Sequence, residues 1–265
     1  MKAEAPLIEF HNASIWRGHT HVFENLNLTI EQHERVAILG PNGSGKTTLL
    51  KTINRELYPV VRAASWVRIL GRERWNVWEL RRRIGIVSHD LHMRYTPTTT
   101  ALEVVTSGFQ ASIGIHGILA REVQPEQLER AAATLDALGI GALRHTPLGA
   151  MSTGQQRRCL LARALVHSPT TLILDEPTAG LDIAAGFDYL RQIRRLAAAG
   201  QNIVIVTHHL NEIPLDIERI ILLKAGVVIA DGGKEETLTA DRLSELYETP
   251  VRVANLDGYY LAYPG

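Results

Sequence analysis

Short, largely apolar runs without a charged residue recur along the chain and predict buried strands. They occupy residues 36–39, 171–174 and 203–206, and each run ends at a glycine or at polar side chains. Runs of this kind are typical of strands buried on both faces of a parallel sheet. Ligands of such sheets bind at the carboxyl ends of the strands, so we expect a site where these runs end.

A segment with helical spacing of apolar residues lies between the runs at 171–174 and 203–206. Apolar residues recur at every third position from Phe187 to Leu196, which predicts a helix that ends before Gly200. A strand, a helix and a second strand in succession indicate parallel pairing. Residues 219–223 and 227–230 flank a Lys-Ala-Gly turn and predict a hairpin.

The composition narrows the class of protein. The chain has 265 residues, of which 45% are hydrophobic, enough to bury a full core. Its 28 Lys and Arg balance 28 Asp and Glu, which argues against binding nucleic acid or an anionic membrane through bulk charge. Cys159 is the single cysteine, so a disulfide within the chain is excluded and a reducing compartment is favoured. The N-terminus lacks the apolar run of a signal peptide, and we expect a cytoplasmic protein.

Residues 40–47, Gly-Pro-Asn-Gly-Ser-Gly-Lys-Thr, match the pattern G-x-x-x-x-G-K-[ST]. They follow a predicted strand and precede a segment with helical spacing, which is the context that a phosphate-binding loop requires. Gly43 and Gly45 let successive N–H groups point inward, and the helix N-terminus attracts phosphate oxygens. We expect Lys46 to neutralise the β- and γ-phosphates of a nucleoside triphosphate, and Thr47 to bind Mg²⁺.

Two carboxylates end the second apolar run. Asp175 is placed to bind Mg²⁺ through water, and Glu176 to orient or deprotonate the water that attacks the γ-phosphorus. The third run ends at Thr207, His208 and His209, and His208 can donate a hydrogen bond to the γ-phosphate. Taken alone, however, such a histidine pair is more often a polar strand end.

Further motifs carry a resemblance to a known family. Residues 151–155, Met-Ser-Thr-Gly-Gln, and the segment after them resemble the signature and its helix in ATP-binding cassette (ABC) transporter ATPases. Residues 177–182 look like the loop that communicates between the two sites of these proteins, and His208 is similar to their switch histidine. The resemblance implies a P-loop NTPase (RecA-like) α/β core with a mainly parallel sheet, N-terminal antiparallel β elements and an inserted helical subdomain.

This resemblance and the hydrophobic pattern predict a single ABC ATPase domain over residues 1–265. The nucleotide-binding α/β core is expected over residues 1–96 and 160–235. Residues 97–159 have helical spacing without a convincing strand, and we interpret them as the helical subdomain with the signature. Residues 236–265 are expected to form a short C-terminal tail.

The resemblance also implies a mechanism. In ABC ATPases two cassettes pair head to tail, and each ATP lies between one subunit's phosphate-binding loop and the other's signature. A dimer is therefore expected, most simply a homodimer with a two-fold axis, in which Ser152 and Gly154 reach the γ-phosphate of the other subunit's ATP. Trp16 lies where the family has an aromatic residue that stacks on adenine, although a lone tryptophan is as often part of a core. The residues expected to bind nucleotide are Trp16, Gly40, Pro41, Asn42, Gly43, Ser44, Gly45, Lys46, Thr47, Thr48, Ser152, Thr153, Gly154, Gln155 and Asp182, with Glu176 and His208 as catalytic residues and Thr47 and Asp175 as ligands of Mg²⁺.

Two positions depart from the family's pattern. Thr153 stands where the family usually has glycine, and a β-branched residue is disfavoured there if the position needs a positive φ. Hydrolysis would then be slower, and we expect it to be retained. The glutamine that usually follows the strand before the helical subdomain is absent, and His89 or His92 is found instead. Because an imidazole titrates near neutral pH, we expect coupling to be more pH-sensitive here than in relatives with the glutamine.

The partner of a cassette determines its biological role. Residues 104–120 form an uncharged stretch that is too polar and too rich in glycine to span a membrane. They lie where the family contacts a membrane subunit, although a buried helix explains them equally well. We expect a separate transmembrane permease, with this chain on the cytoplasmic face of the membrane, and a substrate-binding protein is a further candidate partner.

The transported substrate is less determined. Residues 243–253 resemble the end of cassettes that serve importers of metal chelates, such as iron-siderophores and cobalamin. The signature and the histidine pair resemble a cassette group near molybdate-associated proteins. The alternative is a soluble ABC ATPase that acts on ribosomes or nucleic acid, which the neutral net charge does not favour.

Overall fold

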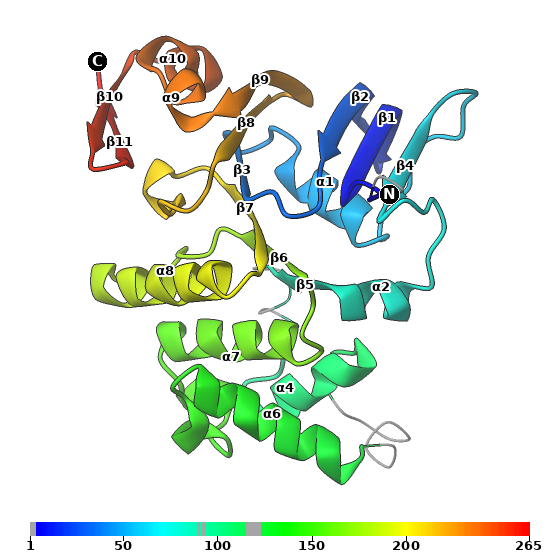
Figure 1. The fold of residues 1–265 in the computed structure, drawn as a ribbon, viewed down its shortest axis with the longest axis vertical. Helices are drawn as coiled ribbons and strands as arrows, with labels where there is room; N and C mark the ends of the chain where they lie inside the picture. Colours follow the sequence, from blue (N-terminus) through cyan, green and yellow to red (C-terminus); the bar gives the residue numbers. More distant parts are fainter. Residues whose placement is uncertain (1–3, 89–90, 92–93, 115–122) are drawn as a thin grey trace. The chain divides into compact units, whose positions relative to one another are not determined.

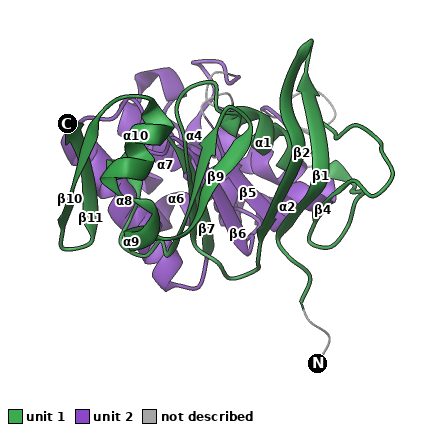
Figure 2. Ribbon diagram, turned by 90° about the horizontal axis from the view of Figure 1, so that it is seen from above, with its two compact units in different colours: residues 1–77, 202–265 green, residues 78–201 purple. Residues whose placement is uncertain are grey.

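The computed structural model describes residues 4–88, 91, 94–114 and 123–265, and the chain forms two compact units (Figures 1 and 2). Unit 1 combines residues 1–77 with residues 202–265, and unit 2 consists of residues 78–201. Both the phosphate-binding loop and His208 belong to unit 1, whereas the signature, Asp175 and Glu176 belong to unit 2.

An antiparallel sheet opens unit 1, as the family resemblance implies. Strand β1 (Ile8–Arg17) lies between β2 (Thr20–Ile30) and β4 (Trp66–Ile69). Arg17 pairs with Thr20, so the turn between β1 and β2 has two residues, and Gly18 at its first position has a φ of 60°. Such turns need positive φ, which glycine adopts without a steric cost.

The second sheet of unit 1 contains two of the predicted parallel strands. Strand β3 (Val36–Leu39) lies between β7 (Asn202–Thr207) and β8 (Arg219–Lys224) and is parallel to both. All residues of β3 and β7 are buried, as expected for strands covered on both faces. Strand β9 (Val227–Gly233) pairs antiparallel with β8, which confirms the predicted hairpin.

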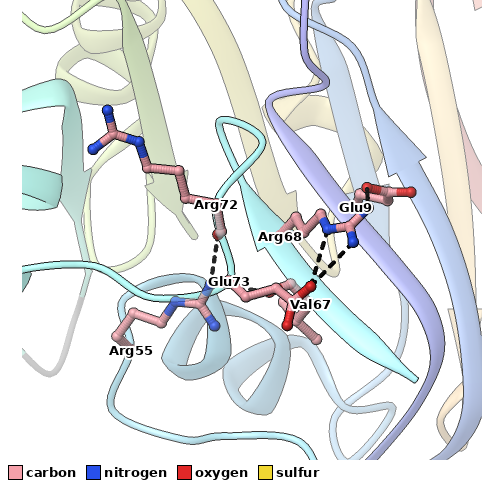
Figure 3. A network of polar contacts seen from close by, with 6 residues as sticks. All are labelled: Glu9, Arg55, Val67, Arg68, Arg72 and Glu73. Atoms are coloured by element: carbon pink, nitrogen blue, oxygen red, sulfur yellow. Dashed lines mark hydrogen bonds and ion pairs between the residues drawn. The ribbon is translucent and has the colours of Figure 1, made fainter. Parts of the chain in front are cut away.

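Helix α1 (Lys46–Ile53) follows the phosphate-binding loop, and a buried arginine joins its C-terminal end to β4 (Figure 3). The Nη2 atom of Arg55 donates to the carbonyl oxygens of Val67 at 3.0 Å and Arg72 at 3.2 Å. Nearby, the guanidinium of Arg68 lies 3.1 Å from Glu73 and 3.8 Å from Glu9 at the surface of the sheet.

The segment predicted as a short tail is folded and packs within unit 1. Helices α9 (Lys234–Thr237) and α10 (Ala240–Tyr247) precede a hairpin of β10 (Val251–Leu256) and β11 (Tyr259–Pro264). Helix α10 contacts β8, and β11 contacts the 3-10 turn η4 (Leu210–Glu212) that follows β7 (Figure 1). The hairpin was not predicted from the sequence.

Unit 2 contains a parallel pair of strands and the helical segment. Helix α2 (Val77–Arg83) leads into β5 (Ile84–Val87), which pairs in parallel with β6 (Thr171–Asp175). Between these strands lie α4 (Ala101–Ser107), α6 (Pro125–Ala137) and α7 (Thr153–Leu165), together with the 3-10 turns η1 (Gly108–Gln110), η2 (Gly141–Leu143) and η3 (Leu148–Ala150). Helix α8 (Ile183–Ala198) follows β6.

The helices of unit 2 pack around α7. Helices α4, α6 and α8 each contact α7, which also contacts β5 (Figure 1). The predicted helices over residues 126–138 and 187–196 correspond to α6 and α8, and α8 begins four residues before the predicted start. The expected boundary of the helical subdomain at residue 159 falls inside α7. In the described ranges, no helix combines the length and the apolar character that crossing a membrane requires.

Candidate active site

The loop of residues 40–47 lies between β3 and α1 in unit 1 and has the shape of a phosphate-binding loop. Gly43 and Gly45 have φ values of 83° and 112°, the left-handed conformation that the predicted anion-binding turn needs. A Cβ at Gly40 would lie 2.2 Å from the carbonyl oxygen of Leu223, so only glycine fits there. The amide of Gly226 donates to the carbonyl of Ser44 at 2.9 Å and fixes the loop to the β8–β9 turn.

Lys46 is buried and closes the loop. Its Nζ donates to the carbonyl oxygen of Gly40 at 2.6 Å and to that of Pro41 at 2.9 Å. An ammonium group carries three donors and a positive charge, both of which suit a phosphate oxygen. Thr47 and Asn42 are exposed, whereas Thr48 is buried beneath the first turn of α1.

These residues fit a nucleoside triphosphate. The Oγ of Ser44 is buried and has no hydrogen-bond partner among the described residues. Helix α1 begins at Lys46 with a glycine N-cap that offers no side-chain acceptor, and its first turn contains no acidic residue. The Ser44 hydroxyl therefore remains available for a phosphate oxygen, and the positive end of the α1 dipole favours its charge.

Strand β7 lies next to the phosphate-binding loop and ends just before His208, the predicted switch histidine. The amide of Gly40 donates to the carbonyl of Thr207 at 3.2 Å, which joins the phosphate-binding loop directly to the end of β7. His208 is half-buried, and its ring centroid lies 3.8 Å from that of the exposed His209. The structure thus brings His208 and the phosphate-binding loop to the same edge of the unit 1 sheet.

Trp16 is a surface residue rather than part of the core. Its side chain is 46% exposed near the end of β1, and its ring stacks on His21 with centroids 4.6 Å apart and an interplanar angle of 11°. An exposed, fixed indole is compatible with stacking on a base, and its role toward adenine stays a prediction.

In unit 2, the two predicted carboxylates lie at the carboxyl end of β6. Asp175 is the last residue of the strand, and both Asp175 and Glu176 are half-buried. Glu176 has a φ of 47°, a left-handed conformation that is uncommon for a residue other than glycine. Its carbonyl accepts from the amide of Ala179 at 3.1 Å, so the chain turns sharply after the carboxylate.

The signature residues form the N-terminus of α7. Ser152 is the N-cap: its hydroxyl accepts from the amide of Gln155, while the Gln155 side chain accepts from the amide of Ser152 at 2.9 Å. Thr153 is the first helical residue and does not have positive φ. The condition under which its β-branched side chain would be disfavoured, a positive φ, is therefore not met. Ser152 and Thr153 are exposed, and a Cβ at Gly154 would lie 3.3 Å from that of Ala185.

Asp182 has a structural role in unit 2 as the N-cap of α8. Its carboxylate accepts from the amide of Ala185 at 2.8 Å. The loop before it contacts the signature helix through Arg157, whose Nη2 donates to the carbonyl of Ala179 at 3.1 Å. Arg157 is 2% exposed, and its Nε and Nη1 atoms have no hydrogen-bond partner in the described part of the chain.

Sequence reasoning missed Arg157, although a signal was present. Arg157, Leu160, Leu161 and Ala164 are spaced as the buried stripe of a helix, and all four are buried. A charged residue in such a stripe indicates a buried polar contact. His89 and His92, the candidates for the missing glutamine, lie outside the described residues.

A phosphate-binding loop on a parallel sheet, with a carboxylate pair and a capped second helix, defines a P-loop NTPase. Residues 23–179 match the model of the ABC transporter family, which is more than half of the chain. The chain belongs to this family and is the ATP-binding, ATP-hydrolysing subunit of an ABC transporter. The predicted fold class and the predicted ATPase activity are confirmed.

Individual relatives agree along almost the whole chain. The uncharacterized ABC transporter ATP-binding protein YlmA of Bacillus subtilis is 33% identical over 252 residues, covering 93% of each chain. The hemin import ATP-binding protein HmuV of Bradyrhizobium diazoefficiens is 29% identical over 266 residues, covering 97% of this chain and 94% of HmuV. The dimeric structure of MJ0796, a bacterial ABC transporter cassette, is similar with a TM-score of 0.69 at 29% identity, covering 85% of this chain and 98% of MJ0796.

Proposed function

We propose that this chain hydrolyses ATP at residues 40–47 and uses the carboxylate of Glu176 as the general base. Lys46 would neutralise the β- and γ-phosphates, and Glu176 would accept the proton of the water that attacks the γ-phosphorus, which leaves ADP and phosphate. His208 would donate a hydrogen bond to the γ-phosphate. The observation that carries the proposal is the loop itself, with the positive φ of Gly43 and Gly45, the buried Lys46 and a buried Ser44 hydroxyl that has no hydrogen-bond partner among the described residues.

Mg²⁺ is part of this proposal. Its candidate ligands are the hydroxyl of Thr47, which is exposed at the start of α1, and the carboxylate of Asp175, which ends β6. The ion would balance phosphate charge and stabilise the leaving group.

A dimer is the proposed working form. The exposed Ser152 and the N-terminus of α7 offer a hydroxyl and the positive end of a helix dipole to an anion, and a second copy would supply that anion as its bound ATP. The dimer of MJ0796 is consistent with this arrangement. A paralogous cassette in place of the second copy would form equivalent sites.

We propose import of a metal chelate through a separate permease as the biological role. The similarity to a hemin import ATP-binding protein over 97% of the chain supports this direction and this substrate class. A substrate-binding protein would deliver the cargo.

The role of Glu176 predicts a separation of binding from turnover. Glu176→Gln should retain ATP binding, lose turnover by about a hundredfold or more, and accumulate an ATP-bound dimer, because the amide cannot accept the proton. Equilibrium binding, steady-state phosphate release and light scattering measure the three effects. Glu129→Gln, at an exposed position of α6, is the matched control and should behave as the wild type. Turnover unchanged in Glu176→Gln would reject this general base.

The transport role is tested by the partner of the native protein. The cassette is recovered from its own host's membranes in mild detergent, and co-purifying proteins are identified by mass spectrometry. A multi-spanning membrane protein supports transport, and reconstitution of the complex in liposomes with metal chelates then tests the cargo. Recovery with ribosomes or nucleic acid would instead support the alternative of a soluble ABC ATPase.

A further inference from the structure

The last residue of α10, Tyr247, contacts the main chain of the switch histidine. Its hydroxyl donates a hydrogen bond of 2.8 Å to the carbonyl oxygen of His208, which is 39 residues earlier in the chain. Both residues belong to unit 1. A bond to the carbonyl restrains the peptide group after His208 and therefore the direction in which the imidazole leaves the strand.

The segment that receives this bond, residues 207–212, is already restrained on its other side. The Thr207 hydroxyl donates to the buried carboxylate of Glu212 and accepts from the amide of His209. These contacts close a compact turn after β7. The bond from Tyr247 reaches the carbonyl of His208 itself.

The residues next to Tyr247 are held by β8 and by the C-terminal hairpin. The Nζ of Lys224, at the end of β8, donates to the carbonyl of Glu245 at 2.7 Å and lies 3.0 Å from the carboxylate of Glu248. The amide of Val251 donates to the Ser244 hydroxyl at 2.9 Å, which joins the hairpin to α10. Ser244 and Glu245 before Tyr247, and Glu248 after it, are thus held by neighbouring elements.

The hairpin reinforces the same region. Strand β11 contacts η4, and a Cβ at Gly258 in the hairpin turn would lie 2.9 Å from Cδ2 of Leu215. Tyr260 is buried, whereas Tyr263 on the opposite face is 47% exposed. The inner face of the hairpin therefore covers the chain that follows His208.

The hydroxyl of Tyr247 remains a donor over the working pH range. Burial raises the pKa of Tyr247 to about 12, so the phenol is neutral near pH 7. A phenolate would repel the carbonyl oxygen of His208, and burial disfavours it.

We infer that Tyr247 is a positioning residue for ATP hydrolysis, through which the C-terminal segment, residues 234–265, orients the switch histidine. The inference rests on the proposed role of His208. The C-terminal segment would then affect turnover without contacting the nucleotide.

The test compares single and double variants of the full-length protein. Tyr247→Phe keeps the ring and removes the donor, so kcat should fall about three- to tenfold, the range expected for one neutral hydrogen bond, with the KM for ATP unchanged. Because Tyr247 acts through His208, the same change in a His208→Ala background should lower kcat no further. Tyr263→Phe removes an exposed hydroxyl from the same segment and should leave kcat unchanged.

A spectroscopic measurement covers the case in which the double variant is too slow to assay. In histidine-labelled protein, Tyr247→Phe should shift the imidazole NMR signals of His208 and leave those of the exposed His33 unchanged. An unshifted His208 signal, an unchanged kcat, or an equal loss of kcat in both backgrounds would each overturn the inference. A raised KM with a lowered melting temperature would also overturn it, since that pattern indicates general loss of structure. If His208→Ala alone leaves kcat unchanged, the proposed role of His208 fails first.

Discussion

Arg55 shows how a buried charge stabilises unit 1. Burial lowers the pKa of its guanidinium, which donates to two main-chain carbonyls beside β4 (Figure 3). Arg55→Met keeps the apolar stem and removes both bonds, so the free energy of unfolding should fall by about 1–3 kcal/mol in denaturant titrations. Arg68→Met, which breaks the exposed pairs with Glu9 and Glu73, should cost less than about 1 kcal/mol. Equal losses in the two variants would contradict this difference.

Individual residues of the phosphate-binding loop could be predicted from the sequence because the conformation of each depends on its neighbours in the chain. Gly43 and Gly45 adopt the positive φ that the motif requires, and Lys46 is buried against the loop carbonyls. Arg157 and Tyr247 could not be assigned partners from the sequence. Their contacts join residues 22 and 39 positions apart, and no local pattern determines which main-chain carbonyl they reach.

At the scale of elements, His167 joins the end of α7 to η1. Its Nε2 lies 3.2 Å from the carbonyl oxygen of Gly108, and its ring packs edge-on against Phe109. Burial lowers the pKa of His167, and the positive charges of Arg82 and Arg130 lower it further. The imidazole is therefore held neutral in the fold.

The lowered pKa of His167 predicts how the free energy of unfolding depends on pH. As the pH falls below about 6.5, the unfolded chain takes up the proton first, so the contribution of His167 to stability is lost. The free-energy difference between wild type and His167→Gln should narrow from mildly basic to mildly acidic pH in urea titrations. A difference that stays constant over this range would show that His167 does not titrate on unfolding.

The helices and strands that were predicted from the sequence are those with an uninterrupted pattern of apolar residues. Strand β3 and helix α6 have one, and both were predicted within two residues at each end. The hairpin of β10 and β11 was missed although Asp257 and Gly258 form its turn, both with positive φ. An Asp-Gly pair between apolar residues is a strong hairpin signal, so this element could have been predicted.

At the scale of the whole molecule, the proposed dimer with sites shared between subunits predicts that two inactive variants can complement each other. Lys46→Ala would remove the proposed phosphate contact, and Ser152→Asp would place a negative charge where the proposal puts the partner's ATP, while it still caps α7. Random pairing makes half of the dimers mixed, each with one intact site, so activity should recover to about a quarter of wild type. A mixture as inactive as its two components would contradict independent sites formed between subunits.

Ser152, the N-cap of α7, is subject to two separate requirements, one from helix capping and one from the proposed contact with phosphate. The oxygen of Ser152 accepts the bond that begins the helix, and its proton is left to donate to a phosphate. Aspartate and asparagine satisfy the first requirement, and only a hydroxyl supplies both functions in so small a space. Substitutions of Ser152 that preserve folding should therefore differ from those that preserve ATP hydrolysis. The set of residues tolerated at this position would show whether a cassette is selected for folding alone or also for turnover.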